Sequence, residues 1–185
     1  MKATLRPALA ATLGQGKAEA MAARLRAVNP GLQVEPIAEF LRDDRLREVL
    51  AAQPYGHVVD AIDSLSPKVF LIALCRELGL PVVSAMGAGG KLDPTQVRVA
   101  DLDHSHHCPL ARMVRKRLHR LGIRQGVEVV FSPEPVQGGI LRLADDEGRG
   151  RSVLGSVPTV PAAFGAACAA VVLRRLAAVP PLPKA

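Results

Sequence analysis

Large aromatic side chains are scarce in this chain of 185 residues, which has four Phe, one Tyr and no Trp. Its core must therefore be built from Ala, Val and Leu, and the hydrophobic fraction of 49% supplies enough of them for a globular protein. The scarcity of rings argues against the base-stacking platforms of single-strand RNA readers. The length suits a single domain with a sizeable core.

Cysteine is also scarce, and the three residues Cys75, Cys108 and Cys168 never form a C-x-x-C pair. An odd, widely spaced set excludes a disulfide framework and a zinc knuckle, and it indicates the reduced thiols of a cytoplasmic protein. Cys75 and Cys168 fall in apolar stretches and are expected in the core. Cys108 lies in a polar loop and is expected to be exposed.

No signal peptide is recognisable, because the first 17 residues contain no continuous apolar core. Residues 157–173 are apolar for about the length of a short membrane span, but two prolines and many small residues favour a buried helix. We therefore do not expect membrane association. Negative charge is in the minority, and the net charge of +7 favours polyanionic partners.

A glycine-rich stretch, "VVSAMGAGGKLDP", occupies residues 82–94. A dinucleotide-binding G-x-G-x-x-G motif starting at Gly87 would need a glycine where Leu92 stands. A Walker loop ending at Gly90 would need a glycine at Ala85. The stretch fits neither phosphate-binding template.

The apolar periodicity predicts an α/β fold. Strand, helix and strand within 57–86 form a parallel βαβ unit. Doubly wound sheets usually begin with a strand, whereas this chain begins with a helix, so we expect an N-terminal βαβ portion to be missing and a sheet edge to be open. Helices are predicted at 17–28, 43–52, 68–79, 109–122 and 160–178, and strands at 32–37, 57–63, 80–86, 96–102 and 127–132. The predicted buried stripes are Met21, Leu25 and Val28 in the first helix and Leu110, Val114, Leu118 and Leu121 in the fourth.

Asp60 and Asp63 lie at the C-terminal end of a predicted parallel strand. Ligands of open α/β sheets bind at such strand ends, where a carboxylate can hold Mg²⁺ against a triphosphate. Capping of the next helix by one of these carboxylates is an equally good interpretation. Lys17, at the start of the first helix, could reach a phosphate or be an ordinary surface lysine.

The helix over 109–122 has a strongly basic side. Such a side is a plausible phosphate track for RNA, and an ordinary solvated helix face is about as good an interpretation. The preceding "HSHHC" segment (104–108) suggests zinc, but neighbouring side chains in one loop seldom chelate one ion, so we do not expect a metal there. The RNA candidates are Arg112, Arg115, Lys116 and Arg120.

The segments "DAIDSLSPKVFLIALCRELGLPVVSAMGAGGKLDPTQVRVADL", "PLARMVRKRL" and "GVEVVFSPE" closely resemble the tRNA threonylcarbamoyladenosine dehydratases, a branch of the ThiF/MoeB-like adenylating enzymes. With "GQGKAEAMAARLRAVNP" and "GSVPTVPAAFG", the resemblance covers about residues 9–176. It implies a single Rossmann-like ThiF-type domain over 1–185. In that domain, about 9–100 would be the remainder of the nucleotide-binding part, 101–178 an RNA and dimerisation part, and 179–185 a tail.

The resemblance implies that ATP activates the carboxylate of a threonylcarbamoyl group as an acyl-adenylate, and that cyclisation then expels AMP. It makes Asp63 the Mg²⁺-ATP residue with Asp60 as its companion, Lys17 a phosphate contact, and Lys68 the basic residue that follows. The loop of Gly87, Gly89 and Gly90 would let backbone approach the acyl-adenylate and its RNA, so that Gly89→Val in a complete homologue abolishes cyclisation.

The phosphate loop of the family is not found in this sequence, so we expect weak ATP binding or none by the chain alone; a low-micromolar dissociation constant would contradict this. Further implied features are a homodimer, a monovalent cation near the glycine loop, and a cysteine desulfurase or sulfur-relay partner. Two alternatives remain. One is an adenylating enzyme for a ubiquitin-like sulfur carrier, disfavoured because no C-x-x-C occurs. The other is a non-catalytic RNA-binding or dimerisation module.

Overall fold

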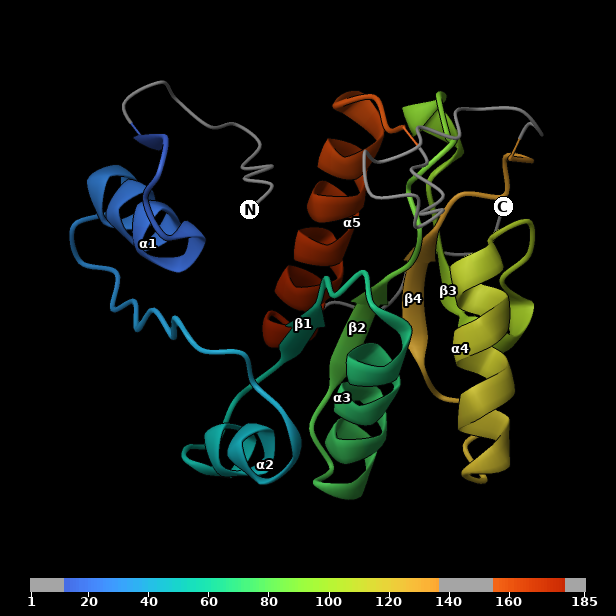
Figure 1. Cartoon of the computed structure of the whole chain (residues 1–185), viewed down its shortest axis with the longest axis horizontal. Coiled ribbons are helices and arrows are strands. Elements are labelled where there is room, and N and C mark those ends of the chain that lie inside the picture. Colours follow the sequence, from blue (N-terminus) through green and yellow to red (C-terminus); the bar gives the residue numbers. More distant parts are fainter. Residues whose placement is uncertain (1–11, 137–154, 179–185) are drawn as a thin grey trace, which may run out of the picture. The chain divides into compact units, whose positions relative to one another are not determined.

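A computed structural model describes residues 12–136 and 155–178 (Figure 1). The predicted tail at 179–185 and the first residues of the predicted domain lie outside these ranges. The chain divides into two compact units, residues 1–42 and 43–185, which are described separately.

The first unit contains helix α1 (Lys17–Val28), as the sequence predicted. Its predicted buried stripe is wrong: Ala22 is the buried residue of the helix, whereas Met21, Leu25 and Val28 are 38%, 39% and 78% exposed. The predicted strand at 32–37 is also wrong, because these residues are irregular. A strand requires a neighbouring strand for its backbone hydrogen bonds, and the sheet formed by the described residues lies wholly in the second unit.

The second unit is built on a four-stranded sheet in the described part of the chain. Its strands are β1 (Val58–Asp60), β2 (Val82–Ala85), β3 (Arg98–Asp101) and β4 (Glu128–Phe131), in the order β1-β2-β4-β3. β1, β2 and β4 run parallel, with Val59 opposite Val83 and Ser84 opposite Val129. β3 is antiparallel to β4. All four strands were predicted, each at somewhat greater length.

The helices of this unit are α2 (Asp43–Ala51), α3 (Leu65–Glu77), α4 (Pro109–Arg120) and α5 (Thr159–Leu176), with 3₁₀ turns at Pro94–Gln96 and Leu102–His104. Each α-helix was predicted. The β1-α3-β2 segment is the predicted parallel βαβ unit. The prediction that Leu121 belongs to the buried stripe of α4 is wrong. Leu121 is the C-cap residue of that helix and is 60% exposed.

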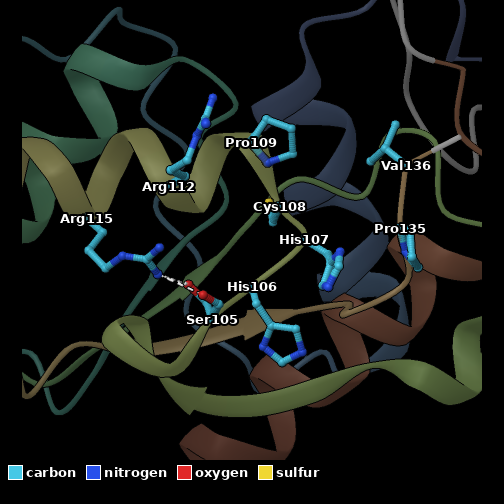
Figure 2. A pocket seen from close by; sticks show the side chains of 9 residues that line it. All are labelled: Ser105, His106, His107, Cys108, Pro109, Arg112, Arg115, Pro135 and Val136. Carbon is cyan, nitrogen blue, oxygen red and sulfur yellow. Dashed lines mark hydrogen bonds between the residues drawn. The ribbon is translucent and has the colours of Figure 1, made fainter. Parts of the chain in front are cut away.

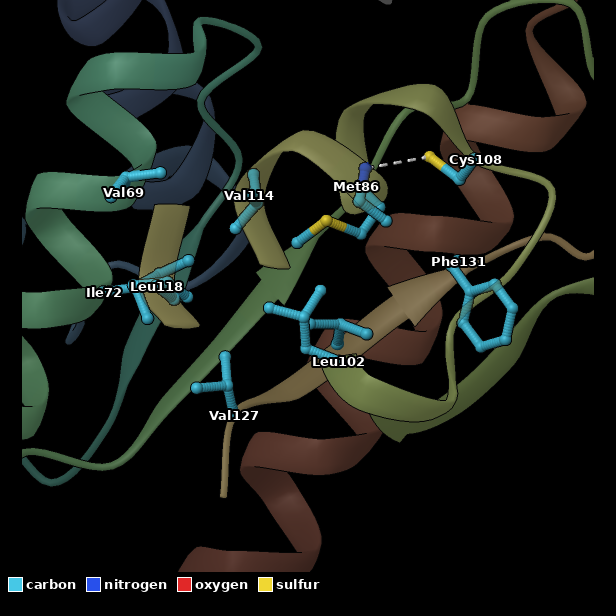
Figure 3. Close-up of a cluster of buried hydrophobic side chains, with 11 residues drawn as sticks. Val69, Ile72, Met86, Leu102, Cys108, Val114, Leu118, Val127 and Phe131 are labelled. Atoms are coloured by element: carbon cyan, nitrogen blue, oxygen red, sulfur yellow. Dashed lines mark hydrogen bonds between the residues drawn. The ribbon is translucent and has the colours of Figure 1, made fainter. Parts of the chain in front are cut away.

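Helices cover both faces of the sheet (Figure 1). On one face, α3 and α4 pack against β4 and its flanking residues to form the larger core, which Figure 3 shows from close by. On the other face, Val160, Phe164, Cys168 and Val171 of α5 pack on Val83 and Val130 of the sheet. As expected from the composition, Val is the commonest side chain at these contacts.

Helix α5 is long and apolar enough to cross a membrane by length and composition alone, and 22% of it is buried in the structure. One side of the helix packs on the sheet, as predicted for a core helix, but the helix as a whole is not buried, and Leu173 and Leu176 are 65% and 63% exposed. β1 pairs with β2 on one side only among the described residues, and Val59 is 50% exposed. The predicted open edge is therefore present in the described sheet.

Candidate functional site

Three loops of the second unit leave the same edge of the sheet. Because β1, β2 and β4 are parallel, the residues that follow them, 61–64, 86–93 and 132–136, emerge together at the carboxyl edge. Asp63 lies on the first loop, Asp60 is the last residue of β1 before that loop, and the glycines lie on the second loop. This arrangement brings the two sets to neighbouring strands, as the sequence analysis expected.

Asp60 is buried at the end of β1 and is paired with Lys68 of α3. Lys68 Nζ donates to Asp60 Oδ2 at 2.7 Å, to Ser84 Oγ at 3.1 Å and to the carbonyl oxygen of Ala85 at 2.9 Å. Ser84 Oγ donates to the same Asp60 oxygen at 2.5 Å, and the Ile62 N–H donates to the other at 2.9 Å. All three ammonium protons of Lys68 are thus used within the protein.

This network ties α3 to the ends of β1 and β2 without exposing its charges, since Asp60, Lys68 and Ser84 all have 0% exposure. Burial lowers the pKa of the Lys68 ammonium, and the Asp60 carboxylate opposes that shift. Burial, reinforced by the Asp60 charge, raises the pKa of the Cys75 thiol to about 11. Burial likewise raises the pKa of Cys168. Both thiols are core residues, as predicted.

Asp63 is exposed in the loop after β1 and accepts a hydrogen bond from Ser64 Oγ at 3.2 Å. The N-cap residue of α3 is Ser64, and no side chain caps that helix. The alternative in which one of the two acidic residues caps the helix is therefore wrong. The Asp63 carboxylate keeps lone pairs available for a cation, whereas the Asp60 carboxylate does not face solvent.

Hydrogen bonds hold the C-terminal end of the glycine loop, at Gly90 and Lys91. Gly90 has φ +70°, a left-handed conformation that favours glycine, and its N–H donates to the carbonyl oxygen of Gly155 at 2.9 Å. The side chain of Lys91 is buried and donates to the carbonyl oxygens of His107 and Glu134. Burial lowers its pKa. The loop therefore depends on the segments that precede α4 and follow β4.

Glu134 completes this attachment from the loop after β4. Its carboxylate accepts the N–H of Leu92 at 2.9 Å and the N–H of Asp93 at 3.1 Å. Charge-assisted hydrogen bonds of this kind are stronger than neutral ones. They hold the turn that follows the glycines.

Cys108 was expected to be exposed, and this prediction is wrong, because the residue is buried with an exposed fraction of 5%. Its sulfur accepts the N–H of Ala111 at 3.5 Å and caps the start of α4. It also lies 3.9 Å from the carbonyl oxygen of Gly87. The thiol thus joins α4 to the glycine loop.

A pocket of about 490 Å³ opens beside Cys108, between the start of α4 and the loop after β4 (Figure 2). His106 stands against Phe131, with ring centroids 5.5 Å apart. No group of three or more His, Cys, Asp or Glu side chains within 12–136 and 155–178 is arranged to hold a metal ion. The residues that line the pocket are Ser105, His106, His107, Cys108, Pro109, Arg112, Arg115, Pro135 and Val136.

The basic residues of α4 divide into two sets. Arg115 donates to the carbonyl oxygens of Leu102 and Ser105 at 3.1 and 2.7 Å, and Arg117 donates to Ser66 Oγ at 2.8 Å. These two hold the fold together. In the described part of the chain, the side chains of Arg112, Lys116 and Arg120 have no hydrogen-bond or ion-pair partner and are exposed.

Lys17 is exposed at the start of α1 and belongs to the first unit, so its contact with a phosphate remains a prediction. The sequence analysis missed Ser84, Lys91 and Glu134. A serine inside an otherwise apolar strand, and a lysine directly after a glycine run, were the available signals. No local pattern marked Glu134, because its partners lie more than 40 residues away.

A largely parallel sheet with helices on both faces, and with acidic and glycine-rich segments at its carboxyl edge, places the chain in the class of doubly wound α/β proteins. Within that class the chain belongs to the ThiF family, whose profile matches residues 8–184.

Named relatives agree with this assignment. The chain is 41% identical to the tRNA threonylcarbamoyladenosine dehydratase of Escherichia coli (strain K12) over 134 residues, which cover 69% of this chain and 50% of that protein. It is 36% identical to the enzyme of Bacillus subtilis (strain 168) over 129 residues, with the same coverage. The crystal structure of the E. coli dehydratase in complex with ATP superposes with a TM-score of 0.81 at 35% identity, covering 92% of this chain and 68% of the other.

These matches confirm the predicted ThiF-type fold and the family resemblance. The chain spans about half the length of the curated relatives it matches.

Proposed function

We propose that this chain takes part in the ATP-dependent cyclisation of threonylcarbamoyladenosine in tRNA. The observation that carries the proposal is the placement of Asp63 and the glycine loop after two paired parallel strands, β1 and β2. This is the edge at which α/β sheets bind nucleotides. The similarity to dehydratases, one of them solved with ATP, supports the same conclusion.

In the proposed reaction, a carboxylate oxygen of the threonylcarbamoyl group attacks the α-phosphorus of ATP and pyrophosphate leaves. The carbamoyl group then attacks the activated carbonyl carbon, loses a proton, and AMP departs as the ring closes. Neither step needs a protein nucleophile. The protein has to position the groups, neutralise phosphate charge and exclude water.

The residues available here fit those tasks. The exposed Asp63 would hold Mg²⁺, which neutralises phosphate oxygens when bound. Asp60 and Lys68 act as positioning residues, because their charges are consumed in the buried network that fixes the ends of β1 and β2. We retain Lys17 as a phosphate contact and Gly87, Gly89 and Gly90 as the loop that lets the acyl-adenylate approach the backbone.

The RNA would follow α4. Its exposed cations Arg112, Lys116 and Arg120 stand at i, i+4 and i+8, on one side of the helix. The helix contains no acidic residue to offset them. Cytoplasmic location, a homodimer and a sulfur-relay partner belong to the same proposal and await measurement.

The test is mass spectrometry of nucleosides from tRNA incubated with the chain, ATP and Mg²⁺. Because weak ATP binding is expected of the chain alone, ATP is supplied in large excess. Under that condition we expect the threonylcarbamoyladenosine to lose one water while AMP appears. Asp63→Asn should abolish both products. Glu48→Gln, which removes the same charge from an exposed ion pair on α2, should leave them unchanged. Equal product from Asp63→Asn and the unsubstituted chain would contradict the assignment of Asp63.

If tRNA binds with a steep salt dependence while neither product forms, the non-catalytic RNA-binding module is favoured instead. The basic row on α4 is the observation that keeps this second candidate open.

A further inference from the structure

The pocket beside the start of α4 has no role in the cyclisation chemistry just described, yet it adjoins the glycine loop. The Cys108 sulfur lies 3.9 Å from the Gly87 carbonyl oxygen, and Lys91 donates to the His107 carbonyl oxygen at 2.9 Å. Anything held in the pocket therefore lies next to the loop assigned to the acyl-adenylate.

The pocket lining is cationic and unopposed. Two arginines supply the positive charge, two histidines add ring N–H donors, and none of the lining residues is acidic. Arg112 has no bonding partner in the described ranges, while Arg115 is held by Ser105, as the dashed line in Figure 2 shows. The pocket also opens at the N-terminal end of α4, where the helix dipole favours negative charge. These features select an anionic ligand.

The same pocket has an aromatic and partly apolar side. The rings of His106 and His107 lie edge to face, 5.3 Å between centroids, and both residues are exposed. His106 Nδ1 lies 3.1 Å from the His104 carbonyl oxygen, which can only accept, so Nδ1 carries a hydrogen. The few Phe and Tyr residues argue against an extended stacking platform, but imidazole rings also stack with bases in RNA-binding sites, and a single base requires only one ring. Pro135 and Val136 complete the wall.

The volume of about 490 Å³ is within the range of pockets that hold a small ligand. Arginine and histidine side chains that line one pocket match the two parts of a nucleotide, with its phosphate on Arg112 and its base on His107. The row of Lys116 and Arg120 continues from Arg112 along α4 and offers further phosphate contacts outside the pocket. A free nucleotide has no neighbouring phosphodiester groups that could bind Lys116 and Arg120, whereas RNA has them.

We infer that this pocket binds one nucleotide of single-stranded RNA, whose adjoining phosphates follow Arg112, Lys116 and Arg120. The inference deepens the proposed function, on which it rests, by giving the substrate RNA a defined entry point. In the tRNA, this nucleotide would neighbour the one that is modified.

The test is fluorescence anisotropy of a labelled anticodon stem-loop RNA with the full chain, over a series of salt concentrations. Arg112→Ala should weaken binding and lower the slope of log affinity against log salt by about 0.7–1, the loss of one phosphate contact. His107→Asn should weaken binding at least about fivefold with an unchanged slope, the signature of a lost base contact. Asparagine suits the position because His107 has φ +53°.

Arg124→Ala is the matched control. It removes one exposed positive charge from the turn after α4 and should change the affinity less than about twofold. Circular dichroism of each variant verifies that the fold is retained. A structural effect would lower thermal stability in parallel with affinity, and that result would overturn the inference.

Three further results would overturn the inference. The first is that the unsubstituted chain does not bind the RNA, the second is that Arg124→Ala and Arg112→Ala change the affinity equally, and the third is that His107→Asn leaves the affinity unchanged. Displacement of the RNA by ATP or AMP, with His107→Asn weakening ATP binding equally, would assign the pocket to the free nucleotide. Because the readout is binding, the inference can hold even if cyclisation fails, and cyclisation can proceed when the pocket variants bind normally.

Discussion

Lys68 Nζ lies 2.7 Å from Asp60 Oδ2, and both side chains are wholly removed from solvent. The pair joins α3 to the ends of β1 and β2, directly below the loops of the candidate site. A buried ion pair costs desolvation of both charges, so its persistence depends on complete hydrogen bonding. Ser84, the Ala85 carbonyl oxygen and the Ile62 N–H provide that bonding.

Removing one member of the pair should therefore destabilise the protein strongly. We expect Lys68→Met or Asp60→Asn to lower the free energy of unfolding by about 3–5 kcal/mol, since each leaves an uncompensated buried charge. Urea denaturation measures this directly. The double variant should cost less than the sum of the two single variants, because it leaves no isolated charge. Strict additivity would show that the two groups are energetically independent.

The Cys75 thiol makes stability depend on alkaline pH. Its pKa is raised from 9.0 to about 11 in the folded protein, so between these values the unfolded chain loses the proton and the folded chain keeps it. The contribution of the thiol is complete below pH 9 and is lost as the pH rises to about 11, by roughly 2–3 kcal/mol.

Denaturation curves between neutral pH and pH 11 should show this loss. The lowered pKa of Lys68 acts in the opposite direction, because the folded ammonium releases its proton first and stability then rises with pH. Cys75→Ala keeps the lysine and removes the thiol, so the difference between the two profiles isolates the thiol. Parallel profiles would contradict a raised thiol pKa.

Two glycines of the loop should respond differently to alanine. Gly90 has φ +70°, which a side chain disfavours, so Gly90→Ala should cost about 1–2 kcal/mol. A Cβ at Gly87 would lie 3.4 Å from Cys108 Sγ and 3.6 Å from Leu110 Cβ, ordinary contact distances, so Gly87→Ala should be within about 0.5 kcal/mol of neutral. Thermal melts compare them. A larger loss of stability in Gly87→Ala than in Gly90→Ala would show that backbone conformation at Gly90 is not the dominant constraint on this loop.

Two arginines of α4 also provide a matched pair. Arg115 donates to the carbonyl oxygens of Leu102 and Ser105, whereas Arg112 has no such bond in the described structure. Arg115→Ala should lower the free energy of unfolding by about 1–3 kcal/mol, and Arg112→Ala should change it by less than about 0.5 kcal/mol. Chemical denaturation decides between them. Equal losses of stability in the two variants would show that Arg112, like Arg115, stabilises the fold.

Local sequence patterns were sufficient for most of the fold. The 3.6-residue periodicity predicted α4, and the apolar runs at 57–63 and 80–86 predicted β1, β2 and their parallel pairing. The pattern failed at 32–37, because alternation marks a candidate strand but supplies no partner. It failed at Leu121 because the helix ends one residue earlier.

The candidate site was less predictable. Asp60 and Asp63 look equivalent in the sequence, yet one is buried against Lys68 and the other is exposed. Cys108 stands in a polar segment but is buried, because its sulfur caps α4. Burial of this kind depends on which segments pack together, and that information is distributed over the whole chain.

The sequence by itself determined the family, the order of helices and strands, and the basic side of α4, because motifs and periodicity are local properties. Only the tertiary structure decided which charges remain available to a ligand. Lys68, Lys91 and Arg115 are turned inward by partners that are 8 to 43 residues away in the chain. Arg112 and Asp63 face solvent because no such partner reaches them in the described structure. Long-range packing, which no single segment encodes, thus separated the charges that are bonded within the protein from those that remain accessible to a ligand.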